Sequence, residues 1–320
     1  MDHLINEIAE RIASHAPRDG LHQTMIPELC FRRASAESEP THTLNMPSLY
    51  IIAQGSKTAT FAGESLVCDS ASYMVTSVHL PVIGKITHAS PQIPYLSLQL
   101  TLGPDVLVDI SRKSSSLEGG ETGRGFLLSP STPSLLDAIL RLVNLLDSPT
   151  DIEILAPLYI REIFYRVLEG GQGASIRQFA VIGSFAQGIS KAIHVINRDY
   201  SKPLVIEELA KKVSLNPATM HKHFKRVTGM SPLQYQKIIR LQSARRLMLT
   251  EGLDAATAGF HVGYESPSQF NREYARLFGR PPKRDINHLR NNEFNMNGTK
   301  AERRKEISDD DFIDGMNSQS

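Results

Sequence analysis

Apolar residues recur with a helical period at the start of the chain and again from about residue 134, with a β-like stretch between. Residues 1–20 predict an amphipathic helix, and residues 111–133, rich in Ser, Gly and Pro, predict a loop. Short β-branched and apolar runs separated by turn residues predict strands at residues 48–53, 57–61, 72–78 and 95–100. Strands spaced this closely indicate a small barrel or sandwich.

The helical region that follows has recognisable start and stop signals. Ser134 is expected to cap a first helix, and Thr150 with Glu153 fits a capping box that opens a second one, which stops at Gly170. A third helix is expected over residues 176–198. The first helix carries the apolar stripe Leu135, Ile139, Leu142, Val143 and Leu146, which is either a dimer seam or core.

An internal repeat stands out near the C-terminal end. Residues 216–232 align with residues 266–282, so that both segments start with an N-cap residue followed by Pro and stop at Gly229 or Gly279. Each keeps an apolar stripe at i, i+4 and i+7, namely Met220, Phe224 and Val227, or Phe270, Tyr274 and Leu277. A short apolar helix and a tight turn precede each segment, which predicts two helix-turn-helix units.

The arc opposite each apolar stripe carries the candidate DNA contacts. Arg and Lys pair with guanine edges and Gln with adenine, while other basic side chains bind phosphates. The expected base-reading residues are Ala218, His221, Lys222, Ser268, Gln269 and Arg272. The expected phosphate contacts are Lys225, Arg226 and Arg276.

Charge supports this assignment once it is divided along the chain. The 320 residues have a net charge of +1, but residues 191–290 alone carry 18 Lys or Arg against 8 Asp or Glu, a net charge of +10. A basic block beside an acidic N-terminal body indicates a module that binds a polyanion. A solvated charged face is the alternative, which the matched pair of units disfavours.

Composition adds several exclusions. With 41% hydrophobic residues the chain can form packed cores, and it has no run of 18 apolar residues that would span a membrane. The start at Met1 lacks the pattern of a secretion signal and only two cysteines occur, so we expect a cytoplasmic protein. The polar residues 291–320 are expected to be disordered.

Residues 186–290 resemble the AraC/XylS family of bacterial transcription regulators. The matching motifs are Glu208-Leu-Ala, Thr228-Gly-Met-Ser-Pro232, Arg240-Leu241 and Val262-Gly-Tyr-Glu-Ser-Pro-Ser-Gln-Phe270. Where this chain has Gly259 the family usually has alanine, and a glycine there weakens the helix by up to about 1 kcal/mol. The resemblance implies promoter DNA and RNA polymerase as partners and allows a homodimer.

The front half resembles the branch of that family with the AraC-type regulator N-terminal domain, through Pro47-Ser-Leu-Tyr50, Gln54-Gly-Ser-Lys57, Ser77-Val-His-Leu-Pro81, Pro94-Tyr-Leu-Ser-Leu98 and Arg161-Glu-Ile-Phe-Tyr165. The resemblance implies a cupin-like barrel that senses a small effector, an aldehyde-like metabolite or a cyclic dinucleotide. Polar residues in or beside the expected barrel are the pocket candidates: Arg32, Tyr50, Gln54, Lys57 and His79. The alternative role for each of these side chains is to hydrogen-bond the backbone of a turn.

Two other functions stay open at this point. A cupin-type metal-dependent enzyme with a nucleic-acid tether would need a clustered His-x-His and a downstream carboxylate, a spacing that His42, His79 and His88 do not show. A regulator that senses redox state through Cys30 and Cys68 is the other, although such cysteines are more often small buried hydrophobes. We expect no catalytic residue, metal or cofactor.

The sequence thus predicts an α+β multidomain protein in four parts. These are a cupin-like sensor with its N-terminal helix at 1–133, a helical connector with a possible dimerisation role at 134–185, a double helix-turn-helix domain at 186–290 and a tail at 291–320. The expected function is a transcription regulator that an effector controls. Neither the target promoter nor the direction of regulation follows from the residues.

Overall fold

The computed structural model describes residues 1–103, 110, 123–181 and 183–291. All but the first residue of the tail expected at 291–320, and residues 111–122 of the loop expected at 111–133, lie outside these residues. The chain forms two compact units, residues 1–239 and residues 240–320, which meet within one helix. The boundaries expected at residues 133 and 185 stay predictions.

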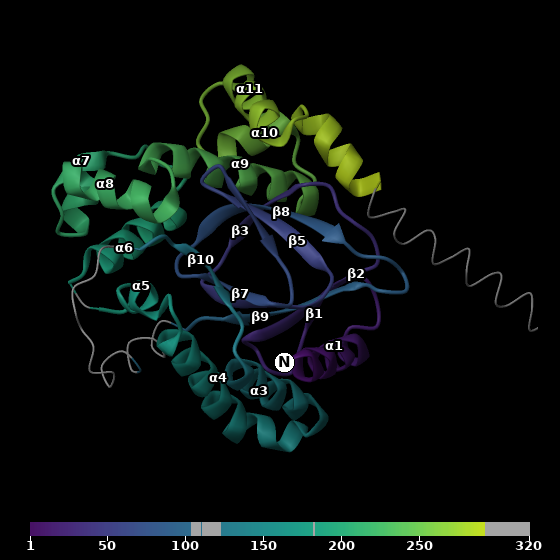
Figure 1. The fold of residues 1–320 in the computed structure, drawn as a ribbon. Coiled ribbons are helices and arrows are strands. Elements are labelled where there is room, and N and C mark those ends of the chain that lie inside the picture. Colours follow the sequence, from purple (N-terminus) through teal and green to yellow (C-terminus); the bar gives the residue numbers. More distant parts are fainter. Residues whose placement is uncertain (104–109, 111–122, 182, 292–320) are drawn as a thin grey trace, which may run out of the picture. The chain divides into compact units, whose positions relative to one another are not determined.

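Two antiparallel sheets form the N-terminal β-domain (Figure 1). The six-stranded sheet has the order β1-β2-β9-β4-β7-β10, and the four-stranded sheet has the order β3-β8-β5-β6. The strands are β1 (Gly20–Gln23), β2 (Leu29–Ala34), β3 (Thr41–Asn45), β4 (Ser48–Gln54), β5 (Ser56–Phe61), β6 (Glu64–Cys68), β7 (Ser72–Thr76), β8 (Leu80–His88), β9 (Tyr95–Thr101) and β10 (Phe126–Pro130). The cupin-like α+β architecture expected from the sequence is confirmed.

Alternation along the strands of the six-stranded sheet separates two hydrophobic cores. Leu49, Ile51 and Ala53 of β4 belong to a core shared with helices outside the sheet, whereas Ile52 belongs to the core between the sheets. Because successive strand residues point to opposite faces, one strand contributes to both cores.

Two expectations for this domain are wrong. Residues 126–130, expected in a loop, form β10, whose Phe126 is buried. Pro81, expected to separate strands, lies inside β8. It pairs with Leu44 of β3, in a part of β8 where β5 does not yet pair with it. Proline, which has no backbone N–H to donate, is tolerated there because this part of β8 pairs with a neighbouring strand on one side only.

Helices α1 (Asp2–His15), α3 (Pro133–Asn144) and α4 (Ile152–Glu169) pack outside the six-stranded sheet (Figure 1). The stripe from Leu135 to Leu146 is buried in this core, which settles its role as core. Thr132, not Ser134, caps α3, by accepting a hydrogen bond from the backbone of Leu135. The capping box expected at Thr150 is also wrong, since residues 149–151 form a 3-10 turn before α4.

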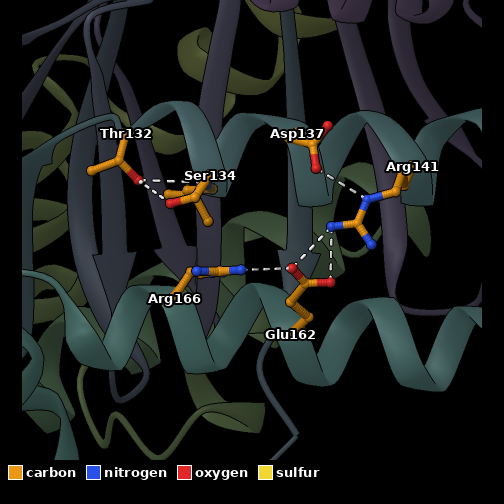
Figure 2. A network of polar contacts seen from close by, with 7 residues as sticks. Thr132, Ser134, Asp137, Arg141, Glu162 and Arg166 are labelled. Carbon is orange, nitrogen blue, oxygen red and sulfur yellow. Dashed lines mark hydrogen bonds and ion pairs between the residues drawn. The ribbon is translucent and has the colours of Figure 1, made fainter.

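A polar network joins the outer faces of α3 and α4 (Figure 2). Arg141 donates to Asp137 one turn away (3.2 Å) and to Glu162 of α4 (2.9 Å), while Arg166 donates to the same carboxylate at 3.2 Å. The hydrogen bond from Arg141 holds the pKa of Glu162 below its usual value. Because these side chains are partly exposed, the network contributes little stability and mainly fixes the register of the two helices.

The helix expected over residues 176–198 is in fact two helices, α5 (Gly173–Arg177) and α6 (Phe185–Arg198), and the Ser184 side chain caps α6. Then follow α7 (Ile206–Lys212), α8 (Pro217–Thr228), α9 (Pro232–Thr250), α10 (Ala255–His261) and α11 (Pro267–Phe278). Within the described part of the chain, no helix is long and apolar enough to cross a membrane.

The C-terminal compact unit contains a buried ion pair that joins distant parts of its sequence. Asp285 is only 2% exposed, and its carboxylate accepts hydrogen bonds from Nε (2.7 Å) and Nη2 (2.8 Å) of Arg245. The Tyr274 hydroxyl donates a third hydrogen bond to the same carboxylate, at 2.7 Å. The Arg245 guanidinium also lies 4.4 Å from the centre of the Phe278 ring. These contacts hold α9, α11 and the helical residues 282–291 together.

Removing this carboxylate should destabilise the C-terminal unit. Asp285→Ala leaves Arg245 partly buried without its counter-ion, a change that costs about 3–5 kcal/mol in comparable buried pairs. Asp137→Ala is the matched control, because that exposed carboxylate contributes less than about 1 kcal/mol. Calorimetry of the full chain should show a lower Tm for one transition in Asp285→Ala only. Equal Tm values for the two variants would contradict this prediction.

Candidate nucleic-acid interface and effector cavity

The two helix-turn-helix units share the local geometry that the repeat predicts. Asn216 and Ser266 cap α8 and α11 by accepting hydrogen bonds from the backbone of Thr219 and Gln269, and Gly229 and Gly279 end the helices in the left-handed conformation. These predictions are confirmed.

The turns before these helices also match. The backbone N–H of Leu215 donates to Ala210, and that of Tyr264 donates to Gly259, each at 3.0 Å. The second unit then has one additional residue, Glu265, before its cap. The two units therefore use the same turn with a slightly different entry into the second helix.

The expected division between core and outer face is present in both helices. Met220, Phe224 and Val227 of α8, and Phe270 and Tyr274 of α11, are completely buried. All nine side chains expected to contact DNA are exposed: Ala218, His221, Lys222, Lys225, Arg226, Ser268, Gln269, Arg272 and Arg276.

Two polar side chains, one beside these faces and one on them, have structural partners. His223 stacks on the Phe185 ring, with centroids 4.2 Å apart, and burial lowers its pKa. Gln269 donates to Glu273 at 3.4 Å, and the same glutamate accepts the Tyr264 hydroxyl at 2.8 Å. His223 is thus a packed residue, whereas Gln269 keeps an exposed side chain tethered within its own helix.

Gly259, the residue at which the chain departs from the family pattern, lies where α10 approaches α11. A Cβ atom at this position would lie 3.0 Å from Cγ and 3.2 Å from Cδ1 of the buried Phe270 ring. The glycine therefore weakens α10 while it allows the ring to pack closely against that helix.

The β-domain contacts the first helix-turn-helix directly, a feature that sequence analysis missed. The backbone N–H of Gly125, just before β10, donates to the carbonyl of Val227 in the last turn of α8 (2.9 Å). Gly229 adds a second contact, since a Cβ there would lie 2.2 Å from Cβ of Ala62 at the β5–β6 turn. This glycine thus ends α8 and also permits the close approach.

A third contact joins the β7–β8 loop to α9. The Tyr235 hydroxyl lies 3.0 Å from the carbonyl oxygen of His79 and 3.1 Å from Oδ1 of Asn197 in α6. Burial raises the pKa of Tyr235, which therefore keeps its one hydrogen and donates it. The His79 carbonyl can only accept that hydrogen. The single hydroxyl hydrogen cannot also serve Oδ1 of Asn197. With the Asn197 amide turned by 180°, its otherwise unpartnered Nδ2 faces the hydroxyl and donates to the tyrosine oxygen.

A cavity of about 110 Å³ lies between the two sheets, within the described residues. Three of the five expected pocket residues line it: Arg32 from β2, Tyr50 from β4 and Lys57 from β5. The Lys57 ammonium stands 4.6 Å from the centre of the Tyr50 ring. The cavity also has apolar walls, formed by Phe31, Ala59, Val82, Ile86 and Phe126.

The other two expected pocket residues lie outside the cavity lining. Gln54 donates to the carbonyl of Pro94 at 2.8 Å and so holds the turn before β9. The carbonyl of His79 accepts the hydrogen bond from the Tyr235 hydroxyl. Burial of the His79 imidazole, together with the nearby His194, lowers its pKa.

The residues behind the two alternative functions have ordinary surroundings. Cys30 and Cys68 are free thiols whose pKa values burial raises, and this keeps them protonated and less reactive near neutral pH. Among the described residues, no three His, Cys, Asp or Glu side chains form a group that could hold a metal ion.

Family comparisons agree with this architecture. The model for the AraC-type transcriptional regulator N-terminus matches residues 25–175, and that for a helix-turn-helix domain matches residues 209–287. The lactose operon transcription activator of Staphylococcus xylosus is 23% identical over 72% of this chain and 80% of its own length. The transcriptional regulator ArgR of Pseudomonas aeruginosa is 26% identical, over 39% of this chain and 38% of its own length.

Solved structures of ToxT from Vibrio cholerae share the fold. One matches with a TM-score of 0.53 and 14% identity, over 80% of this chain and 97% of ToxT. Another, with an unsaturated fatty acid bound, matches with a TM-score of 0.52 and 13% identity, over 81% of this chain and 93% of ToxT. From the two family matches, the regulator relatives and the paired helix-turn-helix units, this chain belongs to the AraC/XylS family of DNA-binding transcription regulators, in the branch with the AraC-type N-terminal domain.

Proposed function

We propose that this regulator binds promoter DNA through the exposed faces of α8 and α11 and that a small effector, bound between the two sheets, controls that binding. The observation that carries the proposal is the exposure of all nine candidate contacts on two matched, capped helices within a block of charge +10. RNA polymerase is the proposed partner at the promoter, and catalysis has no role in the proposal.

The two kinds of contact have different tasks. Side chains near the start of each helix, such as Lys222 and Arg272, would enter the major groove and read base edges. Lys225, Arg226 and Arg276, further along, would bind phosphates and set the register on the duplex.

Binding of the full chain to a selected DNA site should weaken steeply as the salt concentration rises, with a log–log slope of about −0.9 for each neutralised phosphate. A flat slope would refute DNA binding through these faces.

The contacts between the β-domain and the first helix-turn-helix supply a route from the cavity to DNA. Phe126 lines the cavity, and its neighbour Gly125 donates to Val227 of α8. On the other sheet, β8 contributes Val82 and Ile86 to the cavity. This strand begins just after His79, whose carbonyl accepts a hydrogen bond from the Tyr235 hydroxyl. An effector that favours one arrangement of these strands would shift the position of α8.

Cavity size bears on the effector. ToxT, with a similar fold, binds a fatty acid, and family resemblance suggests an aldehyde-like metabolite or a cyclic dinucleotide. An engineered cavity of about 150 Å³ holds a single benzene ring. A space of about 110 Å³ therefore favours a compact metabolite over a cyclic dinucleotide.

Arg272→Ala should relax base preference at one position of the binding site, at a cost of about 1–3 kcal/mol on the best sequence. Arg276→Ala should weaken all sequences nearly equally, because phosphate contacts carry no base information. Selection from randomised DNA with the full-length variants measures both effects. An unchanged motif in Arg272→Ala would show that this side chain does not read a base.

Tyr235→Phe should loosen the contact between the β-domain and α9, whose Tyr235 ring packs against Phe224 of the first helix-turn-helix. The variant leaves the His79 carbonyl without its donor, at a cost of about 1–3 kcal/mol. Hydrogen exchange should then be faster at the Gly125 amide, and operator affinity should change. Tyr159→Phe in α4 is the control, expected to alter neither. If Tyr235→Phe also alters neither, the contact does not couple the two parts.

A further inference from the structure

The cavity between the sheets has an unbalanced charge. Exposed Arg32 and Lys85 and half-buried Lys57 line it, whereas no Asp or Glu is among its lining residues in the described part of the chain. Within the described part of the chain, neither Arg32 nor Lys57 makes an ion pair. Two cationic side chains thus line the cavity without a counter-ion among the residues that the structure describes.

Several uncharged polar groups of the cavity already have partners. Gln99 donates to Ser48 (3.2 Å) and accepts the Cys30 thiol (3.7 Å), while the Thr43 hydroxyl donates to Asn45 at 2.9 Å. Among the described residues, the partner of the Lys57 ammonium is the face of the Tyr50 ring, at 4.6 Å from its centre. An ammonium held in such a place loses hydration that an aromatic face replaces only in part.

We propose that the cavity binds a compact carboxylate, whose negative group lies between Lys57 and Arg32 and whose small apolar body contacts the surrounding aliphatic and aromatic walls. This assignment rests on the proposed function, because it names the effector class for the same cavity. A carboxylate matches the guanidinium fork, and the apolar walls favour an organic acid over inorganic phosphate.

The protonation of Lys57 gives the proposal a measurable sign. Burial lowers its pKa to about 8, and the nearby Arg32 charge adds to the lowering. A bound anion favours the ammonium form and raises this pKa, so binding above about pH 8 takes up a proton and weakens as pH rises.

The other titratable or charged groups that face Lys57 from neighbouring strands are Arg32, Cys30, Tyr50, Cys68, Lys85 and Tyr95. Burial raises the pKa of both thiols and both phenols, to about 12 for Tyr95, so these four groups titrate above Lys57.

Calorimetry with the full chain tests the assignment. The probes are butanoate and benzoate, with butanamide and benzamide as neutral isosteres and inorganic phosphate as a different anion. We expect at least one carboxylate to bind about tenfold or more tighter than its amide at about pH 7, and to weaken at about pH 9.5. Lys57→Met and Arg32→Gln should each weaken binding by about tenfold or more. Lys191→Met, which removes an exposed lysine of α6, should leave it unchanged.

The possible results distinguish failure of the cavity assignment from failure of the proposed function. Equal binding of acid and amide, binding of phosphate alone, or unchanged affinity in both cavity variants would overturn the assignment. Arg32→Gln decides the case if Lys57→Met fails to fold, because Arg32 is exposed. If a neutral metabolite alters operator binding while no carboxylate binds, this inference fails and the proposed function stands. If carboxylates bind but the chain shows no sequence-specific DNA binding, the proposed function fails and the cavity assignment stands.

Discussion

The packing of the β-domain against the first helix-turn-helix is the constraint on which the N-terminal compact unit depends. One hydrophobic core contains the interior of the two sheets and the buried faces of α6, α7 and α8. At its edge, backbone and side-chain hydrogen bonds join Gly125 to Val227 and Tyr235 to His79. Because interiors are close-packed, a strand that moves inside this core must move the helix that shares it.

This arrangement explains how one chain can combine a sensor with a DNA-binding module. The cavity lies between the sheets, and its lining includes residues of β5, β8 and β10. β10 begins next to Gly125, which bonds to α8 of the first helix-turn-helix, and β8 begins next to His79, which bonds to Tyr235 of α9. The helices α3 and α4, by contrast, pack on the far side of the six-stranded sheet, where they stabilise the domain.

Some elements could be predicted and others could not, for identifiable reasons. The strands near residues 48–54, 56–61, 72–76 and 95–101 were found because their apolar runs are long and bounded by turn residues. β10 was missed because five residues between Gly125 and Ser131 show no clear period, and pairing with β7 decides their conformation. β8 was hidden by Pro81, which is tolerated because only β3 pairs with that end of the strand.

By itself, the sequence determined the two helix-turn-helix units and the side chains on their outer faces. Caps, stop residues and apolar stripes act within one or two helical turns, so neighbouring residues in the chain specify them. Only the tertiary structure brought Arg245 to Asp285 and Tyr235 to His79. These pairs lie far apart in the chain, and their proximity depends on strand order and packing, which no local pattern of residues encodes.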